Sequence, residues 1–460
     1  MVVLDFLDNR FYINVCIIFL LLQIIKFVKT LFSIKLNLQT KEKKTFRLHL
    51  IYMLIEGFVL GVLALNEFVF IKSINGSNYQ LGLLFQFSMI VFLFLIIINE
   101  FLKRVKNRAS LLRWVALGSR LPLLLIWFFP HESFAYNNQI YHLIFLGLFL
   151  IYFAGNMVIY PNINYLLKQN YTHSNFGKLY SYATSTNKII MLLVTFAYGY
   201  LLDNDNYAFT YVLPFIGILA ILSGFVLSYI PYPKTDEDFE KSGIYKSVTK
   251  SIIEMKSILK TNIPYRHFEL GFMLYGFSFM ISVTVITIYF YDELNLNYSS
   301  VAFYRNAYNI IAIVLLPYFG KLLGNIDPRK FAAMTYASIA LYIFFVLITT
   351  YLPYNFQLYD VTIYYTLILY IVFHGVFAAS MVLLWNIGSA YFCEANEAGT
   401  YQSLHLSLTG MRAIAAPLLG VLFYQIFGFT ITFSIAIVFL LFAMWLMRWS
   451  YLKESDKIGK

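Results

Sequence analysis

Cysteine and charged residues are scarce in this sequence. Its 460 residues include two cysteines, Cys16 and Cys393, and only 12% are charged. Two thiols this far apart provide neither a disulfide framework nor a cysteine-based metal cluster. The phosphate-binding motif G-x-x-x-x-G-K-[ST] and the nucleophile motif G-x-S-x-G are also missing. We therefore expect no metal, no cofactor and no nucleotide-driven activity.

Hydrophobic residues dominate instead. They make up 60% of the chain, with 46 Phe and 38 Tyr, whereas a soluble domain has about 25% charged residues. Apolar runs of about 20 residues, the length that crosses a bilayer, recur along the chain. They lie near 48–71, 80–102, 112–130, 140–167, 178–201, 207–230, 266–290, 300–322, 330–352, 360–390, 400–425 and 428–450. These runs predict an all-α integral membrane protein with two six-helix bundles, 48–230 and 266–450.

The loops between the runs indicate the orientation. A net charge of +11 could point to nucleic acid, but the basic residues gather in alternate loops, which is typical of the cytoplasmic side of a membrane protein. Basic loop residues include Arg104, Arg108, Lys321, Arg329 and Lys330, and the opposite loops carry Glu132, Asp203, Asp292 and Asp360. We expect the basic loops, the amphipathic linker 231–265 and the tail 451–460 to be cytoplasmic, in a plasma or inner membrane, with no nucleic-acid partner.

Residues 1–47 precede the first bundle and contain another apolar run, 11–32. Gln23, Lys26 and Lys29 interrupt this run. It is either a helix that crosses the membrane or an interfacial helix whose lysines reach the headgroups. We adopt the first reading, an extra N-terminal helix, and consider the segment a candidate docking site for a protein partner.

The two halves of the chain repeat one another. Gly57 matches Gly276, an offset of 219, and at the same offset Asn78-Tyr79 falls on Asn297-Tyr298. An offset kept across a span and a loop indicates two bundles of the same topology, related by a pseudo-two-fold axis along the membrane normal.

This layout resembles the major facilitator superfamily. The loop after the eighth run, Gly320-Lys-Leu-Leu-Gly324-Asn-Ile-Asp327-Pro-Arg329, is similar to the family's Gly-rich loop signature. The loop after the second run keeps basic residues, including Arg104 and Arg108, but lacks the glycines. The resemblance implies a secondary transporter that works by alternating access, with these two loops as gate contacts. It also implies that spans 1, 4, 7 and 10 line the pathway and that spans 3, 6, 9 and 12 face lipid.

Two cations near the middle of apolar runs carry the main functional hypothesis. Lys188 and Arg412 occupy matching runs in the two halves. A cation inside the hydrocarbon layer is costly unless it faces a partner, a cavity or a substrate. We expect both to bind the negative group of a small anionic or zwitterionic solute. The alternative is that Glu56 or backbone carbonyls neutralise them.

Three titratable residues are candidates for proton coupling: Glu56, His374 and His405. A carboxylate or histidine within a membrane span is a frequent proton carrier. Each could also play a structural role, Glu56 through a salt bridge to Lys188 and the histidines through hydrogen bonds to their neighbours.

Glu56, His374 and several other polar residues within the spans are candidates for substrate contacts. The others are Gln86, Asn156, Tyr160, Tyr275, Arg305 and Trp385. We expect Arg120 to be structural on a peripheral span, and His267 and Glu269 to belong to a cytoplasmic gate or cap.

Other function classes remain open at this point. A lipid or amphiphile flippase would use the same fold, with membrane lipid as its partner. A non-transporting accessory or sensor protein would suit the degenerate first gate loop. A membrane transferase using His374 or His405 as its base is the least favoured, since no long loop carries a carboxylate cluster or a metal site.

Overall fold

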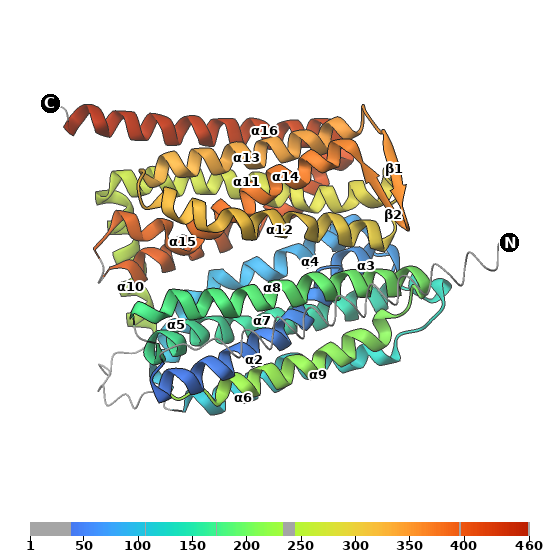
Figure 1. The fold of residues 1–460 in the computed structure, drawn as a ribbon, viewed down its shortest axis with the longest axis horizontal. Coiled ribbons are helices and arrows are strands. Elements are labelled where there is room, and N and C mark those ends of the chain that lie inside the picture. Colours follow the sequence, from blue (N-terminus) through green and yellow to red (C-terminus); the bar gives the residue numbers. More distant parts are fainter. Residues whose placement is uncertain (1–37, 106, 172, 233–243, 395–396, 459–460) are drawn as a thin grey trace.

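The computed structural model describes residues 38–105, 107–171, 173–232, 244–394 and 397–458. The predicted helix 11–32 lies outside the described residues. The rest is almost entirely helical, and Figure 1 shows two packed bundles of long helices. The prediction of an all-α membrane protein with two bundles is confirmed.

The first bundle covers the residues before the linker. Its α-helices are α2 (Thr40–Leu63), α3 (Asn66–Lys72), α4 (Asn78–Ile90), α5 (Leu95–Arg104), α6 (Arg108–Arg120), α7 (Gln139–Asn170), α8 (His173–Asn204) and α9 (Phe209–Ser228). Three short 3₁₀ helices complete it: η1 (Val91–Phe94), η2 (Leu121–Phe128) and η3 (Ser133–Asn137).

The second bundle follows the linker helix α10 (Ile244–Thr261). Its helices are α11 (Ile263–Asp292), α12 (Tyr298–Leu323), α13 (Pro328–Thr349), α14 (Tyr365–Leu383), α15 (Ala398–Ala413) and α16 (Ala416–Ile458). A short π-helix, η4 (Leu384–Gly388), and a 3₁₀ helix, η5 (Ser389–Phe392), follow α14.

The predicted spans correspond to helices, with two irregularities. Ten helical stretches of the described residues are long and apolar enough to cross a membrane, and Asn78–Phe94 is a shorter apolar helix. The long stretch Thr400–Glu454 holds the last two predicted spans. Gly428, with φ 76° and ψ 178°, interrupts α16 and separates those spans, because glycine tolerates a positive φ that other residues disfavour.

Two features were not expected. An antiparallel hairpin, β1 (Asn355–Leu358) and β2 (Val361–Tyr364), precedes α14, so that helix begins at Tyr365 and not near residue 360. Most of the expected tail 451–460 is helical, because α16 continues to Ile458.

Side-chain caps fix several helix starts. The Ser77 hydroxyl accepts a hydrogen bond from the Gln80 amide at 3.3 Å, and the Asn297 side chain accepts one from the Ser300 amide at 3.0 Å. Such caps satisfy backbone donors that have no partner within the helix. The two caps begin α4 and α12, the corresponding spans of the two halves.

The bundles meet through corresponding helices. α8 of the first bundle packs against α12 of the second, and α15 of the second packs against α4, η1 and α5 of the first. At Gly410, a Cβ would lie 2.8 Å from the Cα of Leu93, so α15 approaches η1 closely. This reciprocal pairing is the arrangement that a pseudo-two-fold axis produces.

The two ends of the molecule differ. α10 lies at the end of the molecule where α16 ends, and it contacts α5 of one bundle and α11 and α15 of the other (Figure 1). We call this the linker end. The opposite end carries β1 and β2, and we call it the hairpin end (Figure 1).

Candidate functional site

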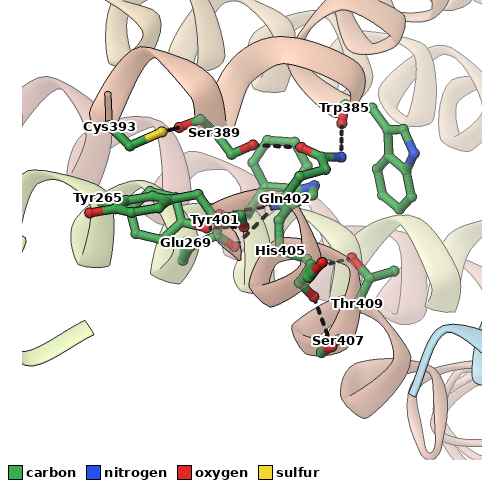
Figure 2. Close-up of polar contacts among 12 residues, drawn as sticks. Tyr265, Glu269, Trp385, Ser389, Cys393, Tyr401, Gln402, His405, Ser407 and Thr409 are labelled. Carbon is green, nitrogen blue, oxygen red and sulfur yellow. Dashed lines mark hydrogen bonds and ion pairs between the residues drawn. The ribbon is translucent and has the colours of Figure 1, made fainter. Parts of the chain in front are cut away.

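A buried acid–base pair lies in the second bundle. Nδ1 of His405 on α15 is 3.0 Å and 3.2 Å from the two carboxylate oxygens of Glu269 on α11. The two residues are 1% and 2% exposed. Figure 2 shows the pair with Tyr265, Tyr401 and Trp385 around it. A group that carries charge this deep is stable only when it is paired, and here an imidazole contacts a carboxylate.

Aromatic rings enclose the pair. The ring centroid of His405 lies 4.5 Å from that of Phe272 and 5.3 Å from that of Trp385, both edge-on. Trp385 sits on η4, and its carbonyl accepts a hydrogen bond from Gln402 Nε2 at 2.9 Å. Trp385 is therefore anchored beside the acid–base pair.

Arg412 lies two helical turns from His405 on α15. It is 7% exposed, its Nη1 donates to the carbonyl of Phe272, and its Cζ is 5.6 Å from the ring centroid of Tyr275. No carboxylate of the described residues forms an ion pair with it, although Glu269 interacts with it electrostatically at longer range. Arg412 is thus a buried cation without a direct counter-ion.

Three buried polar atoms on α13 and α15 have no hydrogen-bond partner among the described residues. They are Nε of Arg412, Nε2 of His405 and the hydroxyl of Tyr336. Tyr336 on α13 stacks on Tyr275, with ring centroids 5.2 Å apart. A buried polar atom without a partner costs free energy, so each of these atoms is available to a partner that the described residues do not supply.

The first bundle holds a second polar cluster. Glu56 on α2 accepts a hydrogen bond from Ser223 on α9 at 2.5 Å and interacts electrostatically with Arg120 at the end of α6. No described ion pair joins Glu56 to Lys188. The alternative in which these two residues neutralise each other therefore has no support in the described contacts.

Arg120 is not a peripheral residue. It is 4% exposed, its Nη2 donates to Asn156 Oδ1 at 2.5 Å, and its Cζ lies 4.6 Å from the ring centroid of Tyr152. The Asn156 amide in turn donates to the hydroxyl of Tyr160 at 3.3 Å, and that tyrosine is half exposed. We expected Arg120 to be structural on a peripheral span, and these contacts place its side chain against α7 inside the bundle.

Lys188 and Gln86 lie where the bundles meet. Nζ of Lys188 on α8 donates to Asn309 Oδ1 on α12 at 3.3 Å. Gln86 on α4 donates through Nε2 to the carbonyl of Ile414, at the break between α15 and α16. Both contacts cross from one bundle to the other. The partner of Lys188 is a neutral amide, so this contact does not balance its positive charge.

His374 is packed among aromatic rings. Its ring centroid lies 3.7 Å from that of Tyr308 and 4.6 Å from that of Tyr342, in nearly parallel stacks. Nδ1 of His374 is 3.0 Å from the hydroxyl of Tyr370. These contacts favour a structural role for this histidine over proton exchange.

Arg305 lies nearer the hairpin end. Its Nη2 donates to Thr287 Oγ1 at 2.6 Å, and the residue interacts electrostatically with Glu67 of α3. Arg305 therefore contributes to the interface between the bundles, and the structure does not bring it to Arg412.

The expected gate residues lie at the linker end. Arg329, 5% exposed, binds Asp327 at 2.8 Å and Glu454 of α16 at 2.6 Å. Arg104 ends α5, Arg108 begins α6, Gly320 lies in the last turn of α12 and Gly324 follows that helix. A cavity of about 560 Å³, lined in part by Asp327, Arg329 and Glu454, opens beside this ion-pair network.

Sequence reasoning misplaced Glu269. We expected a gate or cap, but the carboxylate is buried against His405 inside the bundle. His267, two residues earlier, does lie at the linker end, 2.9 Å from Ser450 Oγ. Glu269 and His405 are 136 residues apart, and the available signal was only that both fall within apolar runs.

Comparison with solved structures supports the fold. A nucleoside transporter, NupG, shares 12% identity at a TM-score of 0.61, over 90% of this chain and 99% of that chain. Peptide transporter POT in complex with sulfate shares 15% identity at a TM-score of 0.60, over 88% and 95%. The human organic anion transporter MFSD10 shares 13% identity at a TM-score of 0.59, over 89% and 100%.

Sequence comparison gives the family. No curated protein matches the chain. The family model described as Major Facilitator Superfamily matches residues 46–361 and 270–460. These two overlapping matches together cover residues 46–460, nearly all of the described residues. The chain belongs to the Major Facilitator Superfamily and is a transporter, not an enzyme.

Proposed function

We propose that the protein is a proton-coupled secondary transporter for a small organic anion or zwitterion. The observation that carries this proposal is Arg412, a buried cation whose Nε has no partner and which forms no ion pair with a described carboxylate. A negatively charged group of the solute would supply the missing counter-ion and hydrogen bond. In this proposal, Lys188 attracts the same group from the bundle interface, and Tyr275 and Tyr336 provide an aromatic wall.

Solved structures of the same fold are compatible with this substrate class. One structural neighbour is an organic anion transporter, and another is a peptide transporter in complex with sulfate. Other neighbours are a xylose transporter and a nucleoside transporter. The fold therefore leaves the solute open, and the uncompensated positive charge is the reason to favour an anion.

Coupling to protons would follow from the Glu269–His405 pair. When the pair holds one extra proton it is an imidazolium next to a carboxylate, with no net charge. After losing that proton its net charge is −1, which the nearby Arg412 stabilises. A bound anion neutralises Arg412 and removes that stabilisation, so anion binding favours proton uptake. By linkage the proton favours anion binding equally, which is the thermodynamic requirement of a symporter.

Glu56 is the second candidate for the proton. It lies deep in the first bundle and interacts with Arg120, but the described hydrogen bond to its side chain comes from a serine. A serine hydroxyl does not titrate in the physiological range, so Glu56 would have to accept the proton alone.

We further propose that the linker end is cytoplasmic and the hairpin end faces the opposite side. The linker end carries the basic residues of the predicted inner loops, including Arg104 and Arg108, and the lysines of α10. Basic segments beside membrane spans are retained on the cytoplasmic side.

Ligand-induced thermal stabilisation of the purified protein tests the substrate class. A panel of organic anions, zwitterions, neutral sugars and amphiphiles should show stabilisation by anionic or zwitterionic members only. Arg412→Ala and Lys188→Ala should abolish that stabilisation, and Arg412→Lys should retain a weakened response because it keeps the charge. Lys256→Ala on the exposed face of α10 is the control and should respond like the parent. Stabilisation by neutral sugars alone, or unchanged binding in both alanine variants, would refute the proposal.

A further inference from the structure

One face of α12 forms a column of contacts with the first bundle. Residues 298, 302, 305 and 309 follow a spacing of four, three and four, so they lie along one side of the helix. The pairs, from the hairpin end inward, are Tyr298 with Ser73, Ala302 with Gly199, Arg305 with Glu67, and Asn309 with Lys188. Two of these four pairs are hydrogen bonds, one is a backbone-close packing contact and one is electrostatic.

Asp203 binds the first turn of α12, where this column of contacts begins. It lies one residue before the end of α8, and its two carboxylate oxygens accept hydrogen bonds from the backbone amides of Tyr298 and Ser299 at 2.7 and 2.8 Å. These amides open α12, a helix of 26 residues, and the first N–H groups of a helix have no partner within it. A carboxylate from the first bundle therefore satisfies two helix donors of the second, with a favourable interaction with the helix dipole.

Neighbouring contacts strengthen this junction. The hydroxyls of Ser73 and Tyr298 are 2.5 Å apart, and Nζ of Lys72 lies 4.5 Å from the centroid of the Tyr298 ring. Lys72 also interacts electrostatically with Asp203. A Cβ at Gly199 would lie 3.1 Å from the carbonyl oxygen of Tyr298, so the helices approach backbone to backbone. Three segments far apart in the sequence thus meet at one place on the hairpin end.

We propose that Asp203 of α8, which caps the N-terminus of α12, is a conformational latch that keeps the hairpin end closed. The inference rests on the alternating access of the proposed function, in which the bundles separate at one end at a time. Both hydrogen bonds of Asp203 connect the first bundle to α12 of the second, so they exist only while the hairpin end is closed. Opening this end exposes two helix amides and one carboxylate to water, and removing the carboxylate destabilises the closed state relative to the open one.

Asp205 provides a matched control. It lies two residues away, but its carboxylate accepts hydrogen bonds from the amide of Tyr207 and the hydroxyl of Tyr211, at 2.9 and 3.2 Å. Both partners belong to the first bundle. Loss of this carboxylate changes the local charge in the same way without touching α12.

Pulsed electron–electron resonance distances can test the latch. Spin labels at exposed positions of the two bundles, Glu132→Cys and Gln357→Cys, report the opening of the hairpin end in a background with Cys16→Ser and Cys393→Ser. In Asp203→Ala we expect the long-distance population to grow relative to the short-distance population, by about ten-fold for a loss of about 1.4 kcal/mol. Asp203→Asn should give an intermediate shift, because its amide oxygen can still accept a hydrogen bond. Asp205→Asn should match the parent.

The outcomes separate the latch from general damage. Two labels within the first bundle, Glu132→Cys and Tyr229→Cys, should keep their distance in every variant if that bundle stays folded. An unchanged Glu132–Gln357 distribution in a folded Asp203→Ala variant would overturn the proposal, as would an equal shift in Asp205→Asn. The distances are measured without solute, so a failure of the substrate proposal leaves this result interpretable by itself.

Discussion

Gly276 on α11 lies directly against the guanidinium of Arg412 on α15. A Cβ at this glycine would overlap the guanidinium atoms of the arginine. Gly57, its counterpart in the repeat, lies against α8 in the same way, where a Cβ would be 2.9 Å from the carbonyl oxygen of Asn187. Both glycines allow the first helix of a bundle to approach the fifth, and in the second bundle that space holds the buried cation.

Replacing this glycine should displace the cation. We expect Gly276→Ala to push Arg412 away from the Phe272 carbonyl, with a loss of about 1–3 kcal/mol in stability from overpacking, and to weaken binding of anionic solutes. Thermal unfolding in detergent and ligand-induced stabilisation measure the two effects. Gly147→Ala is the control, because no atom lies within 4 Å of the Cβ it would add. Equal behaviour of the two variants would contradict the crowding argument.

Glu269→Gln should uncouple transport from protons. The amide has no charge to balance a protonated His405 but can still hydrogen-bond to it, so the bundle should fold. We expect solute counterflow in liposomes to persist, while accumulation driven by a pH gradient disappears. Glu56→Gln separates the two candidates, since it should leave accumulation intact if the pair in the second bundle carries the proton. Loss of accumulation only in Glu56→Gln would assign the coupling to the first bundle.

His374→Phe should leave proton coupling unchanged. Phenylalanine can keep the stacks on Tyr308 and Tyr342 and loses only the hydrogen bond to Tyr370, which is worth about 0.5–1.5 kcal/mol. The same liposome assay with a pH gradient checks this expectation. If accumulation vanished in a folded His374→Phe protein, this histidine would be part of the proton pathway.

Arg329→Ala should destabilise the linker end. The arginine is nearly buried, and it joins Asp327 of the loop after α12 to Glu454 near the end of α16. Removing it leaves two partly exposed carboxylates without their partner, at a cost of about 1–3 kcal/mol. Thermal unfolding should show a lower midpoint, whereas Lys321→Ala, which removes an exposed charge, should have little effect. A midpoint unchanged by Arg329→Ala would show that this network does not support the fold.

Part of this molecule follows from local sequence. The apolar runs, the offset that relates Gly57 to Gly276 and the basic loops predict a membrane protein of two related bundles, because hydropathy and helix length depend on the chain near each residue. Local sequence also identifies Lys188 and Arg412 as candidate functional residues, because a cation within an apolar run stands out whatever its partners are. The bounds of α14 and α16 cannot be predicted from local sequence, because the hairpin before Tyr365 and the ion pair of Glu454 depend on distant contacts.

The partners of the buried charges were decided by tertiary structure alone. Which side of a helix meets which neighbour depends on the rotation and crossing of helices, and no local pattern records it. Sequence reasoning therefore placed Glu269 at a gate and Arg120 on a peripheral span, while packing sets Glu269 against His405 and Arg120 against Asn156. In the same way, Asp203 reads as an acidic loop residue, and only the meeting of α8 with α12 makes it a cap across the two bundles.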